Sequence, residues 1–136
     1  MSEQNKKVAC TFIESMSAGD AATFDSVLAP DAIAIAKGFC RLSGTRQRAQ
    51  MVNGVKAFKQ IVPKGFQPVF RTITAEDDRV MIEWEGNATL SNGAAYHNQY
   101  VMAFTLKDGK ITQVNEYFCT KLADKVMYPV AVTMNV

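Results

Sequence analysis

The chain has 136 residues, a length that fits one domain with a sizeable core. Fifteen Lys and Arg against thirteen Asp and Glu give a net charge of +2, so the clustered basic excess of nucleic-acid-binding proteins is missing. No apolar run approaches the ~20 residues that span a bilayer, and the first residues lack the apolar core of a signal peptide. One His and three Cys argue against a metal site, a Ser-His-Asp triad and a disulfide framework. We therefore expect a soluble, cytoplasmic single domain over residues 1–136, with no metal, cofactor, nucleic-acid or membrane partner.

The first part of the chain has helical periodicity. Apolar residues recur at three- and four-residue steps and predict a first helix with Val8, Ala9, Phe12, Ile13 and Met16 on one face. Gly19 can end this helix, and Asp20 is placed to cap a second, shorter one that Pro30 stops. The alternating residues 31–36 suit a short strand.

Residues 38–54 show little periodicity and carry Arg41, Arg46 and Arg48. They fit either a long loop or a poorly patterned helix. Long loops in compact domains often bind ligands, but an ordinary solvated connection is the favoured interpretation. Helical spacing returns from Val55 to Val62 and ends at Pro63.

From residue 66 the apolar period changes from about 3.6 to two, which is typical of strands. Four such runs cover residues 66–74, 79–90, 95–106 and 111–120. Asn92-Gly93 and Asp108-Gly109 are strong hairpin signals between them. Helices followed by an antiparallel meander predict an α+β fold.

The order of these elements resembles the nuclear-transport-factor-2-like superfamily, most closely its SnoaL-like and ketosteroid-isomerase-like branch. The similar segments are 12–20, 28–32 and 108–117, and the resemblance extends over roughly residues 6–125. It implies a cone-shaped, cystatin-like roll, with N-terminal helices packed on a strongly curved antiparallel sheet that encloses an apolar pocket. The superfamily includes isomerases, cyclases, epoxide hydrolases, dehydratases and non-catalytic domains, so the fold alone does not give the function.

Strand parity predicts which side chains face that pocket. A two-residue turn at Asn92-Gly93 would pair Ser91 with Ala94 and set Glu85 opposite Tyr100. A three-residue turn at residues 107–109 would then put Val114, Glu116 and Phe118 of the last strand on the same face as Met102. The predicted inner face holds Glu83, Glu85, Asn98, Tyr100, Met102, Val114, Glu116 and Phe118.

Glu116 is the leading catalytic candidate. In SnoaL-like cyclases and limonene-type epoxide hydrolases a catalytic carboxylate lies in a pattern similar to Asn115-Glu116-Tyr117, so the resemblance implies that Glu116 is the acid/base. A carboxylate among Phe12 and Phe118 would be desolvated, which raises its pKa toward neutrality. The alternative is an exposed strand Glu or a buried structural hydrogen-bonding group.

Other inward residues complete the candidate site. Tyr100 could donate a hydrogen bond to a substrate, and Glu85 could form a coupled carboxylate pair with Glu116. The predicted ligand-binding residues are Phe12, Met16, Asn98, Met102 and Phe118. Asn98 and Tyr100 could equally serve only to satisfy buried hydrogen-bonding groups.

The chain also departs from its relatives. Phe12 stands where ketosteroid isomerases have the oxyanion-hole Tyr, and Ala36 falls near the position of their general base. Tyr100 falls near their protonated Asp, and Met102 replaces the pocket His of SnoaL-like cyclases. Residues 83–87 lack the Arg that epoxide hydrolases use there.

The predicted outer face of the sheet is apolar, with Ile82, Trp84, Val101 and Tyr117. Such a face should not meet water, so we expect a homodimer through it. The alternative is a parity error that returns Trp84 to the pocket. The apolar C-terminal tail could add a strand or cover a neighbouring element.

Two functions fit the sequence. The first is a cofactor-free isomerase, hydratase, dehydratase or cyclase that acts on a small apolar organic ligand with Glu116 as acid/base. The second is a non-catalytic ligand-binding or dimeric assembly module with the same fold.

Overall fold

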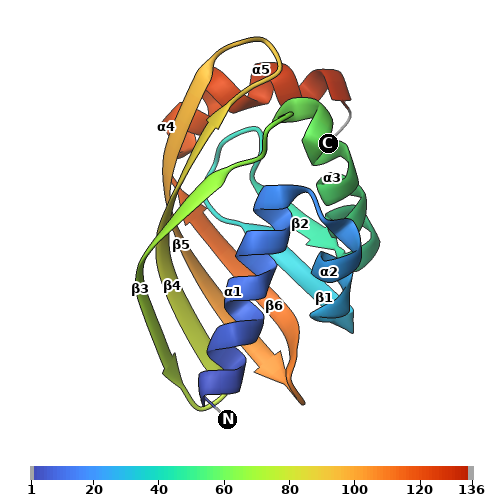
Figure 1. Ribbon diagram of the computed structural model, residues 1–136, viewed down its shortest axis with the longest axis vertical. Coiled ribbons are helices and arrows are strands. Elements are labelled where there is room, and N and C mark those ends of the chain that lie inside the picture. The colour runs from blue at the N-terminus through green and yellow to red at the C-terminus, as the bar shows by residue number, and fades with distance from the viewer. Residues whose placement is uncertain (1, 135–136) are drawn as a thin grey trace.

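The computed structural model describes residues 2–134, in which a strongly curved six-stranded sheet wraps around one long helix (Figure 1). The N-terminal part contains α1 (Ser2–Ala18), α2 (Ala21–Ser26), β1 (Leu28–Ala36), β2 (Gly44–Gln47) and α3 (Arg48–Ile61). The four long strands are β3 (Gln67–Glu76), β4 (Arg79–Thr89), β5 (Ala95–Lys107) and β6 (Lys110–Phe118). The C-terminal segment is helical, with α4 (Thr120–Leu122), η1 (Ala123–Met127), α5 (Tyr128–Ala131) and η2 (Val132–Met134).

The strand order in the sheet is β2-β1-β6-β5-β4-β3. Neighbouring strands are antiparallel except β1 and β6, which run parallel. Register shifts interrupt the β1–β6, β3–β4 and β5–β6 ladders, and such irregularities bend strands and increase their twist. The bent sheet receives α1 on its concave side, so the α+β fold expected from the sequence is confirmed (Figure 1).

The junction of the first two helices follows the sequence signals. Gly19 adopts a left-handed φ of 70°, and the Asp20 side chain accepts a hydrogen bond from the Thr23 backbone N–H at 3.2 Å. The second helix ends at Ser26, earlier than Pro30 suggested, because the chain turns into β1 at Leu28. Proline lacks the N–H that a ladder needs, and the β1–β6 register shift falls in the stretch that contains Pro30.

Residues 38–54 are neither a long loop nor a single helix. They contain a turn, the strand β2 and the first half of α3, which begins at Arg48 rather than at Val55. A reciprocal capping box starts this helix, and the Gln47 backbone N–H donates to the Gln50 side chain at 2.8 Å. Arg48 also forms an ion pair of 2.8 Å with Asp25, which ties α3 to the end of α2.

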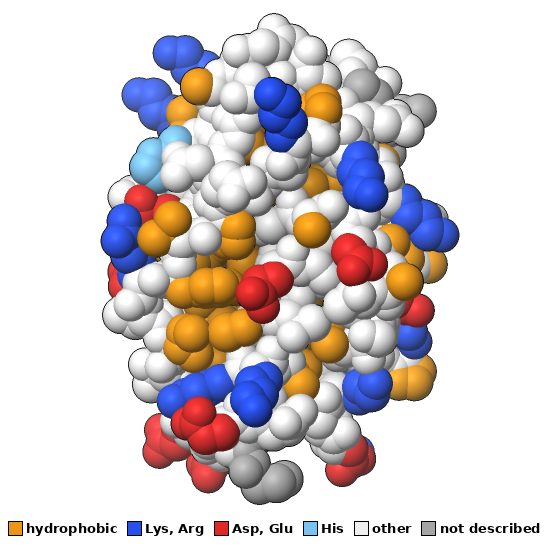
Figure 2. Space-filling view, viewed as in Figure 1, with side chains coloured by type: hydrophobic (Ala, Val, Ile, Leu, Met, Phe, Trp, Pro, Cys, Tyr) orange, Lys and Arg blue, Asp and Glu red, His pale blue; other side chains and the backbone are white. Residues whose placement is uncertain are grey.

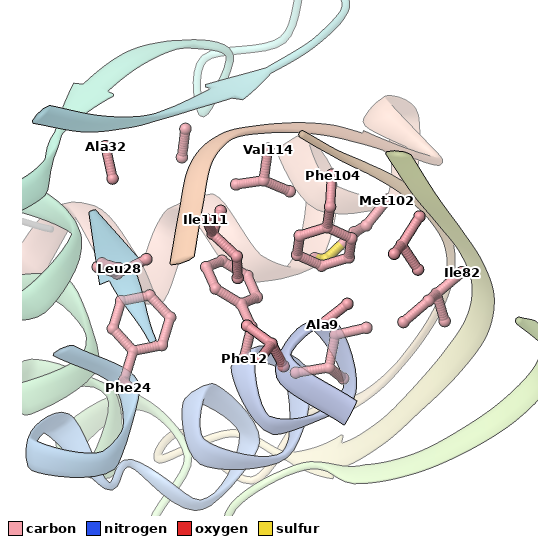
Figure 3. Close-up of a cluster of buried hydrophobic side chains, with 14 of the residues drawn as sticks. Ala9, Phe12, Phe24, Leu28, Ala32, Ile82, Met102, Phe104, Ile111 and Val114 are labelled. Atoms are coloured by element: carbon pink, nitrogen blue, oxygen red, sulfur yellow. The ribbon is translucent and has the colours of Figure 1, made fainter. Parts of the chain in front are cut away.

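Aromatic rings connect the elements of a largely aliphatic main core (Figure 3). Phe12 of α1 contacts Phe24 of α2, with ring centroids 4.7 Å apart, and Phe104 of β5, with centroids 5.2 Å apart. This cluster therefore fixes α1 against both the second helix and the sheet. Hydrophobic side chains also gather between α1 and β3 (Figure 2), where Phe70 and Ile73 are partly buried against the same core.

The predicted parity of β4 is wrong. The hairpin pairs Leu90 with Ala94 rather than Ser91 with Ala94, because a three-residue turn with Gly93 at a φ of 86° joins the strands. The Gly93 N–H donates to the Leu90 carbonyl at 2.9 Å. One extra residue in the turn reverses the face of every β4 side chain relative to β5.

This reversal corrects the expected inner and outer faces. Trp84 now pairs with Tyr100 and Ile82 with Met102, and both Trp84 and Ile82 are buried inside. Glu85 pairs with Gln99 on the outer face. The outer face therefore lacks two of the four apolar residues expected there.

The parity of β5 and β6 is correct, although the turn differs from the expected one. Asp108 and Gly109 form a two-residue turn with φ values of 52° and 75°. A register shift between Thr105 and Leu106 then adds the missing residue, so Met102 still shares its face with Glu116.

None of the helices in residues 2–134 is long and apolar enough to cross a membrane.

Candidate functional site

A cavity of about 450 Å³ opens between the inner face of the sheet, α3 and the C-terminal helices. Eight aromatic residues are among the described residues that line it, namely Phe12, Phe24, Phe58, Phe66, Trp84, Tyr96, Tyr100 and Phe118. Six of the predicted site residues line it, namely Phe12, Met16, Tyr100, Met102, Glu116 and Phe118. The size and the lining suit a small, largely apolar organic molecule.

Asn98 does not line this cavity, contrary to expectation. Its side chain is buried and its amide N–H₂ donates to the Tyr96 hydroxyl at 2.7 Å and to the Cys119 carbonyl at 3.1 Å. Its amide oxygen accepts from the backbone N–H groups of Gln99 and Cys119 at 2.8 and 3.2 Å. Asn98 thus joins β5 to the start of the C-terminal segment and holds Tyr96 in place.

Glu85 is also outside the cavity, so the expected carboxylate pair does not exist. It lies on the outer face, where it forms an ion pair of 3.0 Å with Arg71 and a hydrogen bond of 3.0 Å with His97. The hydrogen bond from Arg71, followed by that from His97, lowers the pKa of Glu85. An ionised, externally paired carboxylate cannot assist Glu116 across the sheet.

Glu116 occupies the expected position on the inner face. Its strand β6 pairs it with Ala36 of β1 on one side and with Met102 of β5 on the other. The pKa of Glu116 is raised because burial disfavours the ionised form, and the positive charge of Arg46 partly opposes this effect. Within residues 2–134 no hydrogen bond or ion pair holds its carboxyl group, which leaves it free to contact a ligand.

Two tyrosines of β5, Tyr96 and Tyr100, line the same cavity as Glu116. Burial raises the pKa of Tyr100 well above its ordinary value, and the neighbouring Tyr96 and Glu116 raise it further. Burial likewise raises the pKa of Tyr96. Both phenols therefore stay protonated at neutral pH, so each acts as a neutral hydrogen-bonding group.

Three polar residues of the wall, Arg46, Gln50 and Asn53, were not predicted to face the pocket. In the sequence, Arg46 was noted only as one of three arginines in residues 38–54. The three wall residues come from β2 and α3, within the stretch that showed little periodicity. Arg46 pairs with Ala34 of β1, which places it on the same face as the inward residues of β6. The inward position of Arg46 follows only from the place of β2 beside β1, because no motif in residues 38–54 indicates it.

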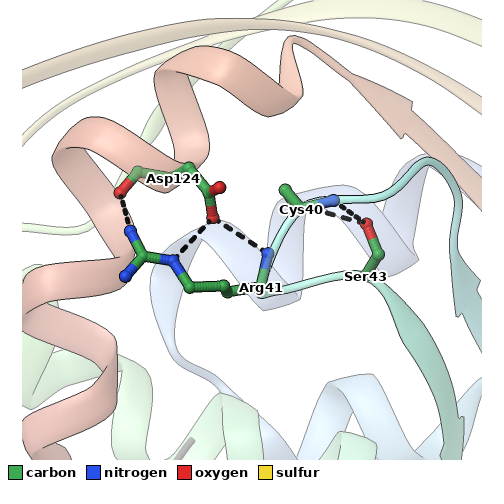
Figure 4. Close-up of polar contacts among 4 residues, drawn as sticks. All are labelled: Cys40, Arg41, Ser43 and Asp124. Carbon is green, nitrogen blue, oxygen red and sulfur yellow. Dashed lines mark hydrogen bonds and ion pairs between the residues drawn. The ribbon is translucent and has the colours of Figure 1, made fainter.

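The C-terminal helices close one end of the cavity, where Ala123, Met127 and Ala131 line it. Arg41 fastens this segment to the turn before β2 (Figure 4). Its backbone N–H donates to the Asp124 carboxylate at 2.9 Å, and its guanidinium donates to the Asp124 carbonyl at 3.1 Å. The guanidinium also lies 4.0 Å from the centre of the Tyr128 ring. The tail thus covers the cavity rather than adding a strand.

Among residues 2–134, no three His, Cys, Asp or Glu side chains gather closely enough to hold a metal ion. The groups available for chemistry in the cavity are a carboxyl group that retains its proton more readily than usual, neutral phenols and one guanidinium.

Similar folds occur in several solved structures. The chain is similar to Bal32a from a soil-derived mobile gene cassette, with 20% identity, a TM-score of 0.79, and coverage of 91% of this chain and 96% of that one. An LEH-like epoxide hydrolase of M. tuberculosis is 19% identical, with a TM-score of 0.74 and coverage of 99% and 98%. TerC, co-crystallised with polyporic acid, is 20% identical, with a TM-score of 0.76 and coverage of 91% and 98%. At sequence identities this low, the structural similarity shows a shared fold and nothing further.

The family is shown by the sequence itself, since the family model of the SnoaL-like domain matches residues 10–114. The chain belongs to the SnoaL-like domain family, within the nuclear-transport-factor-2-like fold. No curated protein matches the chain.

Proposed function

We propose that the protein is a cofactor-free acid/base enzyme that acts on a small, largely apolar carbonyl compound, with Glu116 as the group that moves the proton. The observation that carries this proposal is the carboxyl of Glu116 in an aromatic-walled cavity, where burial raises its pKa. A base whose pKa lies closer to the working pH can both take and return a proton.

The reaction favoured by these groups is an isomerisation. Ionised Glu116 takes a proton from a carbon next to the substrate carbonyl, and Tyr100 donates a hydrogen bond to the oxygen on which negative charge develops. Glu116 then returns the proton to another carbon. Glu116 is the one carboxylate among the described residues that line the cavity. One carboxylate is enough to move a proton from one carbon of the substrate to another.

Reactions that activate water with two carboxylates fit less well, because Glu85 points outward. The structural relatives support a small organic ligand, since one is an LEH-like epoxide hydrolase and another was co-crystallised with polyporic acid. A water-dependent hydration or dehydration would need a different second group, for which Tyr100 is the available candidate.

The test is hydrogen–deuterium exchange at the carbon next to the carbonyl of 2-tetralone, followed by NMR in D₂O. The protein should accelerate this exchange over buffer, and Glu116→Gln should return the rate to that of buffer while the fold is kept. Glu76→Gln, an exposed change at the end of β3, is the matched control and should leave the rate unaffected. An unchanged rate in Glu116→Gln would show that Glu116 is not the base.

A second candidate function is a binding module without turnover. It is favoured by Phe12, which lies on the cavity wall at the position where ketosteroid isomerases have the oxyanion-hole Tyr. It is also favoured because, within residues 2–134, no hydrogen bond or ion pair orients the Glu116 carboxyl group. Native mass spectrometry of the freshly purified protein distinguishes the two functions. A retained small molecule that is released chemically unchanged would support binding alone.

We also propose a homodimer through the outer face of β4–β6, and a cytoplasmic location consistent with three free cysteines. Met81 and Tyr117 are exposed there with partly buried Val101 between them. Val101 and Tyr117 belong to the expected interface, and Met81 takes the place of Ile82 and Trp84 on β4. Light scattering during size exclusion should give twice the chain mass for the unmodified protein. Val101→Lys should give the monomer mass, and a monomeric unmodified protein would contradict the proposal.

A further inference from the structure

Arg46 is the one cationic side chain among the described residues that line the cavity. It is partly buried, and its guanidinium donates a hydrogen bond to the Leu42 carbonyl at 3.0 Å. Within residues 2–134 it forms no ion pair with a carboxylate. A guanidinium has five N–H donors, so most of its hydrogen-bonding capacity is open to a ligand.

The position of Arg46 relative to Glu116 follows from strand pairing. Arg46 lies opposite Ala34 on one side of β1, and Glu116 lies opposite Ala36 on the other side. Two strand spacings and a shift of two residues put their Cα atoms roughly 12 Å apart. Both alanines also line the cavity, and their short side chains leave the space between the two charged groups open.

The two groups therefore face a common space without touching. The charge of Arg46 reaches Glu116, because it lowers the pKa that burial raises, yet the pair is not within ion-pair distance. An arginine that is partly buried in a cavity, near a carboxyl group and not paired with it is positioned to receive a negatively charged oxygen. Guanidinium groups bind carboxylates with two parallel hydrogen bonds, which is stronger than binding by a neutral donor.

We propose that Arg46 is a specificity-determining residue and that the ligand is an aromatic acid, whose ring lies along Trp84 and Tyr100 and whose anionic oxygens bind Arg46. The stacked rings of these two residues provide a flat wall for such a ring. This inference rests on the proposed use of the same cavity, but it concerns recognition and does not require turnover.

The test compares two probes of nearly the same shape, 2-naphthoate and 2-naphthamide, by isothermal titration calorimetry at neutral pH. The protein should bind 2-naphthoate about tenfold to a hundredfold more tightly, which is the range for a hydrogen bond to a charged group. The indole N–H signal of Trp84 should shift with both probes, because this is the chain's single Trp and it lines the cavity.

The variants separate charge from structure. Arg46→Gln should lose the preference for 2-naphthoate and keep its affinity for 2-naphthamide, whereas Arg46→Lys should retain part of the preference. Arg79→Gln removes the same charge from an exposed position at the start of β4 and should change neither affinity. No preference in the unmodified protein, or a preference that Arg46→Gln leaves intact, would overturn the inference.

Failure of this proposal is distinguishable from failure of the proposed function. Loss of ketone exchange in Glu116→Gln together with equal binding of the two probes would retain the acid/base role and reject anion recognition. A strong preference for 2-naphthoate with no exchange activity would do the reverse.

Discussion

The Trp84 indole lies almost parallel to the Tyr100 ring, with centroids 4.3 Å apart and an interplanar angle of 12°. The two residues are directly opposite on β4 and β5, so their stacking shows that both side chains lie on the inward face of the sheet. It also holds the Tyr100 ring against the sheet on the side where Glu116 lies. The orientation of the phenol thus depends on the register of the β4–β5 hairpin, whose turn at residues 91–93 precedes Tyr100 in the chain.

Tyr100→Phe should reduce proton-transfer activity by about 100-fold, the effect of removing one donor to a developing oxyanion. The ring and its stack with Trp84 remain, so the melting temperature should change little. Ketone exchange in D₂O and thermal unfolding measure the two quantities. Full activity in this variant would assign the donor role to another group.

Glu116→Gln should alter the pH dependence of stability. The folded-state pKa of Glu116 is raised, so the folded protein binds this proton more tightly than the unfolded chain does. Its contribution to stability is present below the unfolded value of about 4.3 and is lost as the pH rises through the raised pKa. Urea unfolding at several pH values should show this loss in the unmodified protein and not in the variant.

The size of that effect is about 1.4 kcal/mol for each unit by which the pKa is raised. Above the raised pKa, Glu116→Gln should be the more stable protein. The exposed change Glu76→Gln should leave the pH profile as it is. Parallel profiles for the unmodified protein and Glu116→Gln would contradict a raised pKa.

Gly65 and Gly93 form a matched pair for a stability experiment. Both have left-handed φ values, 72° and 86°, but a Cβ on Gly65 would lie 2.7 Å from the Ser17 carbonyl oxygen, whereas one on Gly93 would meet nothing within 4 Å. The Ser17 carbonyl is fixed because it accepts the Phe66 N–H at 2.9 Å.

Gly93→Ala should therefore cost about 1–2 kcal/mol of unfolding free energy from the backbone alone. Gly65→Ala should cost about 1–3 kcal/mol more because of the added steric overlap. Chemical denaturation of both variants measures the difference. Equal losses would show that the segment around Gly65 can shift.

The contact between Arg41 and Asp124 should govern how readily the C-terminal helices open. Arg41→Ala and Asp124→Ala should each cost about 1 kcal/mol or less, because the pair is largely exposed. Both should speed hydrogen exchange in residues 120–131 and release of a bound probe. Lys125→Ala, an exposed neighbour, is the control, and a double mutant that is simply additive would argue against direct coupling.

Much of the fold could be predicted because its signals are local. The periodicity around Phe12, the Gly19-Asp20 junction and the strand runs are properties of short segments. The inward face of β6 was also predictable, and with it the position of Glu116. The start of α3 was not predicted, because its N-cap is Gln47 rather than one of the usual Ser, Thr, Asp or Asn residues, although Met51 and Val55 already have helical spacing.

The predicted inner and outer faces of β4 were exchanged because of the assumed turn type. The prediction relied on Asn92-Gly93 as a two-residue turn, although hairpin loops of two and three residues are both common. The pattern of β4 itself is more informative, since Val80, Ile82 and Trp84 alternate with polar or exposed positions. Burial of alternate apolar residues outweighs the preference of one dipeptide for a turn type, and here it moved Glu85 out of the site.

Arg46 could not have been found from sequence alone. Its role depends on β2 lying beside β1, on the parallel pairing of β1 with β6, and on small alanines between them. These are long-range contacts that no local pattern encodes.

The measurement that tests the central claim most directly is the titration of the Glu116 carboxyl carbon by ¹³C NMR, assigned with Glu116→Gln. We predict a midpoint above the ordinary Glu value of about 4.3, and a still higher midpoint in Arg46→Gln, because burial raises this pKa and Arg46 lowers it. A midpoint at or below the ordinary value would contradict a desolvated acid/base group in the cavity.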